Sequence, residues 1–251
     1  ATTAYVGGKY PVTFHNHHTF TAKNKDEIIL SDFRFAYAES LVLKVEHLVI
    51  PQGSIVGVIG NNGAGKTTFA RCLCGLEKKA SGAITIKGET YLRKKRLNQC
   101  YMVMQNPSHQ LFTEDVLDEV LLSMDGDEEE NRPIAEKILS DLNLMPFTER
   151  HPMSLSGGQQ QRVAVASAVA SGREIMIFDE PTSGLDFRHM EEVAKVLEKL
   201  QKAGKTLFII THDPELIERC CDYFIFIENG EVSWHGGWNL QNKQQLELFF
   251  G

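Results

Sequence analysis

The chain has 251 residues, 42% hydrophobic and 24% charged, which is enough to bury a substantial core in one large α/β domain. Its formal net charge of −7 argues against non-specific nucleic-acid binding, because such binding depends on Lys and Arg neutralising phosphates. No apolar run approaches the roughly 18 residues of a membrane span, no signal peptide is evident, and five cysteines, two of them adjacent, favour reduced thiols over disulfides or a zinc site.

Residues 1–27 are predicted to be a linker or a loosely ordered lead-in, because they mix polar, aromatic and histidine residues without an apolar centre. The clustered His15, His17 and His18 have no carboxylate or cysteine close by, so we interpret them as a solvated segment rather than a metal site. The first residue, Ala1, fits either a processed start or a piece of a longer polypeptide. The folded domain is expected to occupy residues 28–251.

Two stretches in which apolar and polar residues partly alternate, 28–35 and 41–50, are predicted to form half-buried strands. Tyr37 lies between them in a predicted turn. Such an aromatic side chain could stack on a nucleobase or could be a packed loop tyrosine, and its spacing favours neither.

The sequence Gly-Asn-Asn-Gly-Ala-Gly-Lys-Thr-Thr at residues 60–68 predicts a phosphate site. It follows an apolar, β-branched run and opens into a predicted helix, which is the context that this motif requires. The glycines let the backbone approach a ligand, and successive N–H groups point at one place beside the positive end of the helix dipole. Lys66 can reach the β- and γ-phosphates, and the Thr67 hydroxyl can ligate Mg²⁺. The alternative, a glycine-rich turn with a solvated lysine, would need all these residues in register by chance.

The next part of the chain is predicted to contain strands at 81–88 and 99–104, with a solvated basic run at 93–96 between them. Residues 113–148 are predicted to be rich in helix. An acidic stretch at 125–130 is interpreted as a surface loop that leads to a helix beginning near Pro133.

The second half alternates strands with helices. The sequence predicts strands at 175–178, 206–210, 223–227 and 231–234, and helices at 190–200 and from Pro214. Strands that alternate with crossover helices indicate a largely parallel sheet.

Three polar residues follow buried strands of this predicted sheet. Asp179 and Glu180 end one strand, and His212 ends the next. Ligands of open α/β sheets lie beyond the carboxyl ends of the strands, so these side chains are expected beside the phosphate loop. Asp179 could then hold Mg²⁺, Glu180 could take a proton from an attacking water, and His212 could contact a γ-phosphate. Either carboxylate alone could be a helix cap, but that is a weak account of the pair.

Residues 155–159, Leu-Ser-Gly-Gly-Gln, precede a helix with little bulk on one side. A serine hydroxyl and two glycine N–H groups at a helix N-terminus suit an anion. Since one γ-phosphate does not need two such cradles from one chain, the second is expected to serve the nucleotide of a partner, which predicts a head-to-tail dimer.

With these motifs in order, the chain resembles an ATP-binding-cassette (ABC) ATPase domain over about residues 28–234. The motifs that match are the Walker A loop at 60–67, the Q-loop at Gln105, the signature at 155–159, Walker B at 175–179 with Glu180 beside it, the D-loop at 183–186 and the switch histidine His212. The resemblance implies an α/β P-loop NTPase fold with a largely parallel sheet core. It also implies an N-terminal antiparallel β subdomain and a helical subdomain, roughly 106–165, that carries the signature.

The resemblance further implies ATP and Mg²⁺ as cofactors. Catalytic roles would fall to Lys66, Gln105, Glu180 and His212, and Mg²⁺ would be held by Thr67, Gln105 and Asp179. Tyr37 would stack on adenine, Gln105 would also contact a membrane partner, and Ser156 and Gly158 would touch the γ-phosphate on the opposite subunit. The implied nucleotide-binding residues are Tyr37, Asn61, Asn62, Gly63, Ala64, Gly65, Lys66, Thr67, Thr68, Gln105, Ser156, Gly157, Gly158, Gln159 and Asp186.

A finer resemblance, to the ATPases of energy-coupling-factor (ECF) transporters, rests on residues 105–112 and 150–158. It implies a chain that energises import of a vitamin or of cobalt or nickel, working in the cytoplasm on the inner face of the membrane. Its partners would be an integral membrane subunit and a second cassette. Only about twenty residues follow Gly230, where many members have a longer extension, so the chain resembles the second cassette of a tandem ATPase, and either a homodimer or a heterodimer remains open.

Two other functions were weighed. A soluble ABC ATPase acting on DNA or the ribosome is disfavoured, because Lys66 and Ser156 lie too close in sequence for a long coiled coil and the acidic balance opposes nucleic-acid binding. A regulatory cassette that binds ATP without hydrolysis usually lacks the catalytic acid or the switch histidine, and both are intact here. The sequence therefore favours hydrolysis, without nucleic acid as a partner.

Overall fold

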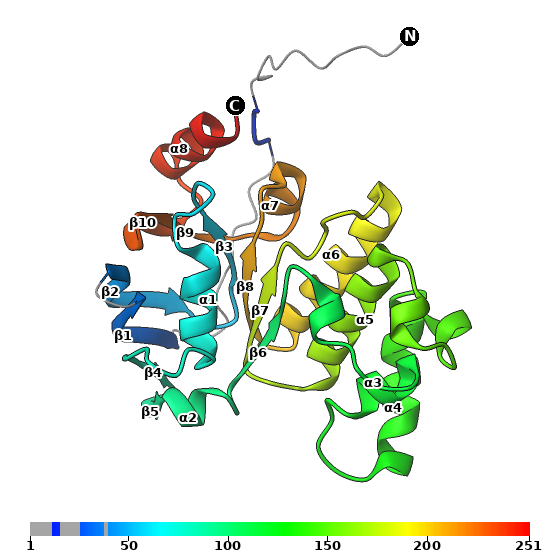
Figure 1. The fold of residues 1–251 in the computed structure, drawn as a ribbon. Helices are drawn as coiled ribbons and strands as arrows, with labels where there is room; N and C mark the ends of the chain where they lie inside the picture. Colours follow the sequence, from blue (N-terminus) through cyan, green and yellow to red (C-terminus); the bar gives the residue numbers. More distant parts are fainter. Residues whose placement is uncertain (1–11, 16–25, 38–39) are drawn as a thin grey trace.

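The computed structural model describes residues 12–15, 26–37 and 40–251 (Figure 1). Within them, ten strands form one sheet in the order β5-β4-β1-β2-β10-β9-β3-β8-β7-β6. The strands are β1 Glu27–Tyr37, β2 Ser40–Pro51, β3 Ile55–Ile59, β4 Ala83–Ile86, β5 Glu89–Leu92, β6 Cys100–Val103, β7 Ile175–Asp179, β8 Thr206–Ile210, β9 Tyr223–Glu228 and β10 Glu231–Gly237.

One end of the sheet is parallel, as the alternation of strands and helices predicts. Strands β6, β7, β8, β3 and β9 pair in parallel, and β3, β7 and β8 are buried along their whole length. Alternate side chains of β3 enter different cores, Ile55 and Ile59 on one face and Val56 and Val58 on the other. Strands covered on both faces read as continuous apolar runs rather than as alternating ones, which explains their sequences.

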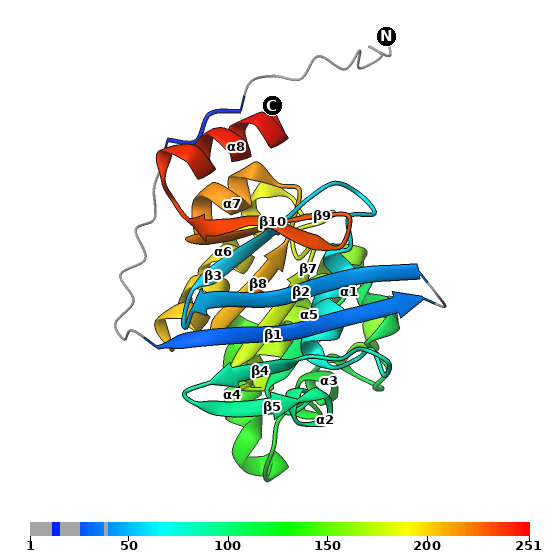
Figure 2. The same ribbon diagram turned by 90° about the vertical axis from the view of Figure 1, so that its left-hand side faces the viewer.

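The antiparallel strands lie at the other end of the sheet (Figure 2). Strand β1 pairs antiparallel with β2 on one side and with β4 on the other, and β4 pairs with β5. The expected antiparallel β subdomain is therefore present. The short β5 has mostly exposed residues and lacks the alternation that would have predicted it.

Helices cover both faces of the sheet (Figure 1). Helix α1 packs on the face that β1 and β2 also cover, while α5 and α6 belong to the core on the opposite face. The helices are α1 Lys66–Cys74, α2 Arg93–Arg96, α3 Val116–Leu121, α4 Glu128–Asp141, α5 Gly157–Ala170, α6 Phe187–Lys202, α7 Pro214–Cys220 and α8 Leu240–Phe250, with short 3₁₀ turns at Pro107–His109, Met145–Phe147 and Pro152–Ser154.

Two predictions about the middle of the chain are wrong. Helix α4 begins at Glu128 rather than near Pro133, because the Asp127 side chain caps it and the acidic residues of the expected loop form its first turn, where the helix dipole favours them. The basic run is not wholly solvated either. Arg96 is fully buried, its guanidinium lies 4.7 Å from the centre of the Phe33 ring, and it donates hydrogen bonds to the Gly82 and Cys72 carbonyls.

Part of the expected lead-in is packed. Phe14 is 1% exposed, its backbone N–H donates to the Glu247 carboxylate at 3.0 Å, and its ring makes edge contacts with Trp238 and Phe250. Residues 12–15 are thus packed against the folded domain, and the linker or lead-in over residues 1–27 stays a prediction. His17 and His18, and most of the predicted lead-in, lie outside the described residues.

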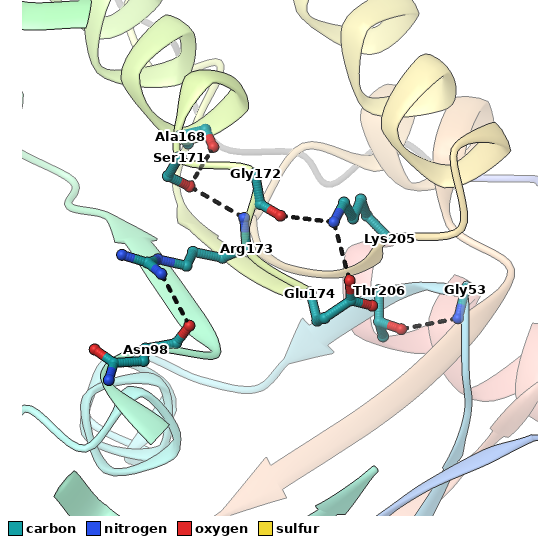
Figure 3. Close-up of polar contacts among 9 residues, drawn as sticks. All are labelled: Gly53, Asn98, Ala168, Ser171, Gly172, Arg173, Glu174, Lys205 and Thr206. Atoms are coloured by element: carbon teal, nitrogen blue, oxygen red, sulfur yellow. Dashed lines mark hydrogen bonds and ion pairs between the residues drawn. The ribbon is translucent and has the colours of Figure 1, made fainter. Parts of the chain in front are cut away.

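The amino ends of the central strands are tied together by polar contacts (Figure 3). The Lys205 ammonium donates to the Gly172 carbonyl at 2.6 Å and pairs with the Glu174 carboxylate at 3.1 Å, linking the starts of β8 and β7. The Gly53 N–H donates to the Thr206 hydroxyl at 2.8 Å, linking β3 to β8. These ties hold the strands in register and leave their carboxyl ends for the candidate site.

No helix in the described part of the chain is both long and apolar enough to cross a membrane.

Candidate functional site

The loop between β3 and α1 is built on glycines that its shape requires. Gly60 has φ +154°, and a Cβ there would lie 2.2 Å from the Ile227 carbonyl oxygen of the neighbouring strand β9. Gly65, with φ +105°, precedes the first turn of α1. The loop is closed by a hydrogen bond of 3.1 Å from the Ala64 N–H to the Asn61 carbonyl and is fastened to the sheet by one of 2.8 Å from the Gly230 N–H to the Ala64 carbonyl. The shape of the loop is thus held by its own glycines and backbone hydrogen bonds.

Lys66 lies over this loop. Its ammonium donates to the Gly60 and Asn61 carbonyls at 2.7 and 2.9 Å. Burial lowers the pKa of Lys66, while the charges of Glu180 and Asp179 act in the opposite direction. The cation is held at the edge of a cavity of about 260 Å³, where a phosphate could take over its hydrogen bonds.

Asp179 and Thr67 meet across this cavity, as the shared edge of the sheet predicts. The Thr67 hydroxyl donates to the Asp179 carboxylate at 2.8 Å. Burial raises the pKa of Asp179, and the Thr67 hydrogen bond and Lys66 charge partly offset this. A hydroxyl and a carboxylate side by side are hard oxygen donors of the kind that Mg²⁺ takes, so these residues fit that ion.

Glu180 follows Asp179 in a left-handed backbone conformation, with φ +52°. Its N–H donates to the Ile210 carbonyl of β8 at 2.8 Å, which fixes the turn. A non-glycine residue in this region costs of the order of 1 kcal/mol or more, and such strain is often kept at functional sites. Burial raises the pKa of Glu180, which makes the carboxylate a better proton acceptor than an exposed one.

His212 faces Glu180 from the end of β8. Its Nε2 lies 3.8 Å from the Glu180 carboxylate, and burial, followed by the charge of Lys66, lowers the pKa of the imidazole. The cavity of about 260 Å³ is lined by Val42, Asn62, Gly63, Gly65, Lys66, Thr67, Thr68, Gln105, Asp179, Glu180, Ile210 and His212. Asn61 and Ala64 contribute backbone contacts behind it.

Tyr37 is not among the residues that line this cavity. It ends β1, is 56% exposed, and its ring makes an edge contact with Phe35 at 4.7 Å between centroids. Its predicted stacking on adenine stays a prediction.

The second anion cradle opens into a different cavity, of about 690 Å³. There the Ser156 hydroxyl caps α5 by accepting the Gln159 N–H at 3.4 Å, and the Gln159 side chain accepts the Ser156 N–H at 2.9 Å. Gly157 and Gly158 line the same cavity, and a Cβ on Gly158 would meet the Leu185 side chain at 3.0 Å. Asp186, on the wall formed by residues 183–186, caps α6 by accepting the His189 N–H at 2.9 Å.

The chain therefore carries two half-sites. Lys66, Thr67, Asp179, Glu180 and His212 surround one cavity, and the signature residues surround the other. Gln105 is exposed and lines both. Within the described residues, the two cradles do not share one cavity.

Residues 43–183 match the family model described as ABC transporter. The chain belongs to the ABC transporter family. Such cassettes are the ATP-binding, ATP-hydrolysing domains of transporters, so the geometry above is that of an ABC ATPase domain with a P-loop NTPase fold.

Curated relatives agree. A putative ABC transporter ATP-binding protein of Treponema denticola is 40% identical over 248 residues, which cover 99% of this chain and 48% of the relative. The energy-coupling factor transporter ATP-binding protein EcfA1 of Fusobacterium nucleatum is 35% identical, covering 83% of this chain and 81% of the relative. The chain spans about half the length of the first curated relatives that it matches.

Solved structures show the same fold. A cbiO1 protein from Clostridium perfringens, described as part of an ABC transporter complex, matches with a TM-score of 0.72 and 28% identity over 87% of this chain and 89% of that chain. A dimeric ATP-binding cassette in a post-hydrolysis state, bound to ADP and phosphate, matches with a TM-score of 0.74 and 27% identity over 84% and 99%.

Sequence reasoning missed two residues beside the site. Val42 lines the phosphate-loop cavity from β2, and Phe249 of α8 lies against the His212 ring. Neither belongs to a motif, and each reaches the site from a distant part of the chain. Only the tertiary fold reveals them.

Proposed function

We propose that this ABC ATPase domain hydrolyses ATP between two cassettes to drive an ECF-type importer of a vitamin or of cobalt or nickel. The observation that carries the proposal is the division of the site between two cavities. The hydrolytic groups surround one and the signature residues surround the other. The binding site around a nucleotide in the first cavity is completed only when the signature residues of another cassette close over it.

The residues of the first cavity have separable roles. Lys66 and the loop N–H groups bind the β- and γ-phosphates, exchanging the loop carbonyls for phosphate oxygens. Glu180 accepts the proton of the attacking water, and its strained, buried position suits it to that role. His212, from the neighbouring strand, orients the γ-phosphate. Thr67, Asp179 and Gln105 would hold Mg²⁺, which supplies charge neutralisation to the phosphates.

The second cassette supplies the remaining contacts. Ser156, Gly157, Gly158 and Gln159 present an N-capped helix start to the γ-phosphate of the opposite subunit, and Asp186 lies on the facing wall. The dimeric relative with bound ADP and phosphate supports this arrangement. The partner is a second copy or a different cassette, and the double length of the first curated relatives favours a tandem partner.

The membrane subunit would dock beside Gln105. A groove of about 520 Å³ is lined by Met104, the residue before Gln105, and by Leu97, Phe112 and Leu122, which are 41%, 73% and 60% exposed. The Gln110 side chain ties the segment after the 3₁₀ turn at Pro107–His109 to the end of β6, because it accepts the Met104 N–H and donates to the Met102 carbonyl, both at 2.7 Å. Docking on this groove would place the chain on the inner face of the membrane and transmit movement to Gln105. The ECF-type assignment is supported by the EcfA1 relative and the cbiO1 structure.

The test is the molar mass of Glu180→Gln by light scattering, with and without Mg-ATP, beside the control Glu129→Gln at an exposed position of α4. Losing the base without losing the binding site should trap the ATP-bound form. An ATP-dependent doubling would support pairing of identical cassettes, and a monomer that still binds ATP would support a tandem or heterologous partner. A folded sample that binds no ATP would refute the proposal, and turnover at the parent rate would remove Glu180 as the base.

A further inference from the structure

The last helix of the chain lies against the switch histidine. The ring of Phe249, in the final turn of α8, stacks on the imidazole of His212 with 6.4 Å between centroids and 26° between planes. Aromatic pairs at such separations attract each other beyond their buried area. No sequence motif connects these residues.

Phe249 is itself held in place from several sides. Its ring makes edge contacts with Phe226 of β9 at 5.2 Å and with Phe250 at 5.0 Å. Phe226 in turn stacks on Trp234 of β10 at 5.5 Å. The ring therefore rests on the sheet rather than on a free helix end.

The start of the described chain secures the other side of α8. Phe14 contacts Phe250 at 6.2 Å and Trp238 at 5.6 Å, and its N–H donates to Glu247 of α8. Figures 1 and 2 both show residues 12–15, drawn in dark blue, running beside α8. A line of aromatic rings thus extends from Phe14 through Phe250 and Phe249 to His212.

The His212 side chain lies partly in solvent. Its side chain is 42% exposed, and Nε2 lies 3.8 Å from the Glu180 carboxylate, beyond normal hydrogen-bond length. Among the described residues, Phe249 is the aromatic side chain that pairs with this imidazole. A catalytic group that must meet a γ-phosphate loses rate when its orientation is not held.

We propose that Phe249 is a positioning residue for His212, and that α8, secured by Phe14, thereby controls the rate of ATP hydrolysis. The inference rests on the proposed role of His212 at the γ-phosphate. It gives the C-terminal helix and the segment before β1 a joint function: they set the orientation of one catalytic side chain without touching the nucleotide.

The experiment compares Phe249→Leu with Phe250→Leu in the full chain. Both remove a ring from the same helix end, but Phe250 does not contact His212 in the structure. Phe249→Leu should lower kcat roughly two- to ten-fold at unchanged KM, as expected from the loss of one aromatic contact, and Phe249→Tyr should retain the parent rate. Phe250→Leu should lower kcat less than Phe249→Leu does, because the Phe250 ring pairs with Phe249 and Phe14 and not with His212. In a His212→Ala background, Phe249→Leu should have no further effect.

A second measurement does not depend on turnover. The imidazole proton signals of His212, assigned with His212→Ala, should move downfield in Phe249→Leu because the ring-current shift is lost, and they should move less in Phe250→Leu, which keeps the Phe249 ring. Unmoved signals in Phe249→Leu, equal losses of rate in both Leu variants, or an undiminished effect of Phe249→Leu in the His212→Ala background would each overturn the inference. Parent-rate turnover by His212→Ala would instead overturn the role of His212 in the proposed function, a different failure.

Discussion

Replacing Asp222 with Asn should change how the stability of this domain depends on pH. Asp222 is 7% exposed and precedes β9. Its carboxylate accepts the Ile55 N–H at 3.0 Å and a hydrogen bond from the Gln201 amide, so it joins β3 to the end of α6. Burial raises the pKa of Asp222 from 3.8 to about 7, despite these hydrogen bonds. Asn has the same shape, can keep the Ile55 contact and is never charged.

The direction in which folding stability changes with pH follows from proton linkage. Below about pH 4 the side chain is protonated in both the folded and the unfolded chain, and its contribution to stability is fully present. Between the two pKa values the unfolded chain ionises while the folded one keeps its proton, so stability falls as the pH rises and is lost through about pH 7. At 1.36 kcal/mol for each pKa unit, the total loss is up to about 4 kcal/mol, of which roughly 2–3 kcal/mol falls between pH 5 and pH 8.

Urea unfolding of the parent and of Asp222→Asn at pH 5 and pH 8 measures this effect. The stability of Asp222→Asn relative to the parent should rise by roughly 2–3 kcal/mol between the two pH values. The matched control is Asp26→Asn, at an exposed carboxylate. A difference between parent and Asp222→Asn that is the same at both pH values, or that changes in the opposite direction, would refute the argument from burial.

Two further substitutions test the site and the packing. Lys66→Ala should abolish nucleotide binding or turnover, because the Lys66 ammonium is the cation held over the phosphate loop. Lys95→Ala, at an exposed position, should leave both unchanged. Calorimetric titration with ATP measures the binding, and undiminished ATPase activity in Lys66→Ala would contradict the loop assignment. Arg96→Met should destabilise the fold by about 1–3 kcal/mol, because it removes the Arg96 donor of the Gly82 carbonyl and one of the two donors of the Cys72 carbonyl, which keeps the Gly75 N–H. The exposed Lys94→Met should stay within about 0.5 kcal/mol. Equal unfolding midpoints for the two variants would contradict the buried role of Arg96.

The candidate site could be predicted because its chemistry is local in sequence. The phosphate loop needs glycines, a lysine and a threonine at fixed spacing between a strand and a helix, and all of them lie within residues 60–68. Asp179 and His212 were found by a second rule, that the carboxyl ends of parallel strands meet at one edge. The contact between Thr67 and Asp179 is the direct consequence of that rule.

What sequence reasoning missed depends on distant partners. Arg96 sits among basic neighbours, and only Phe33 and Gly82, far away in the chain, make its position a buried one. Helix α8 was not predicted because it buries only Asn242 and Leu246, so it has no apolar stripe of helical period. The packing of Phe14 was missed because nothing near it in sequence indicates Trp238 and Phe250, the rings against which it packs.

On the proposed function, the divided site gives one chain a need for partners. Gln105 is exposed, lines both cavities and follows Met104, which lines the groove proposed for the membrane subunit. A displacement of this residue would alter the Mg²⁺ and water environment of one nucleotide and the wall of the signature cavity at the same time. His212 is reached from the opposite direction, through α8 and Phe249. On these proposals, two side chains of the hydrolytic site are positioned by different surfaces. Contact with the membrane subunit positions Gln105, and contact with the segment that precedes β1 positions His212. Hydrolysis would then be fast only when both surfaces are correctly engaged.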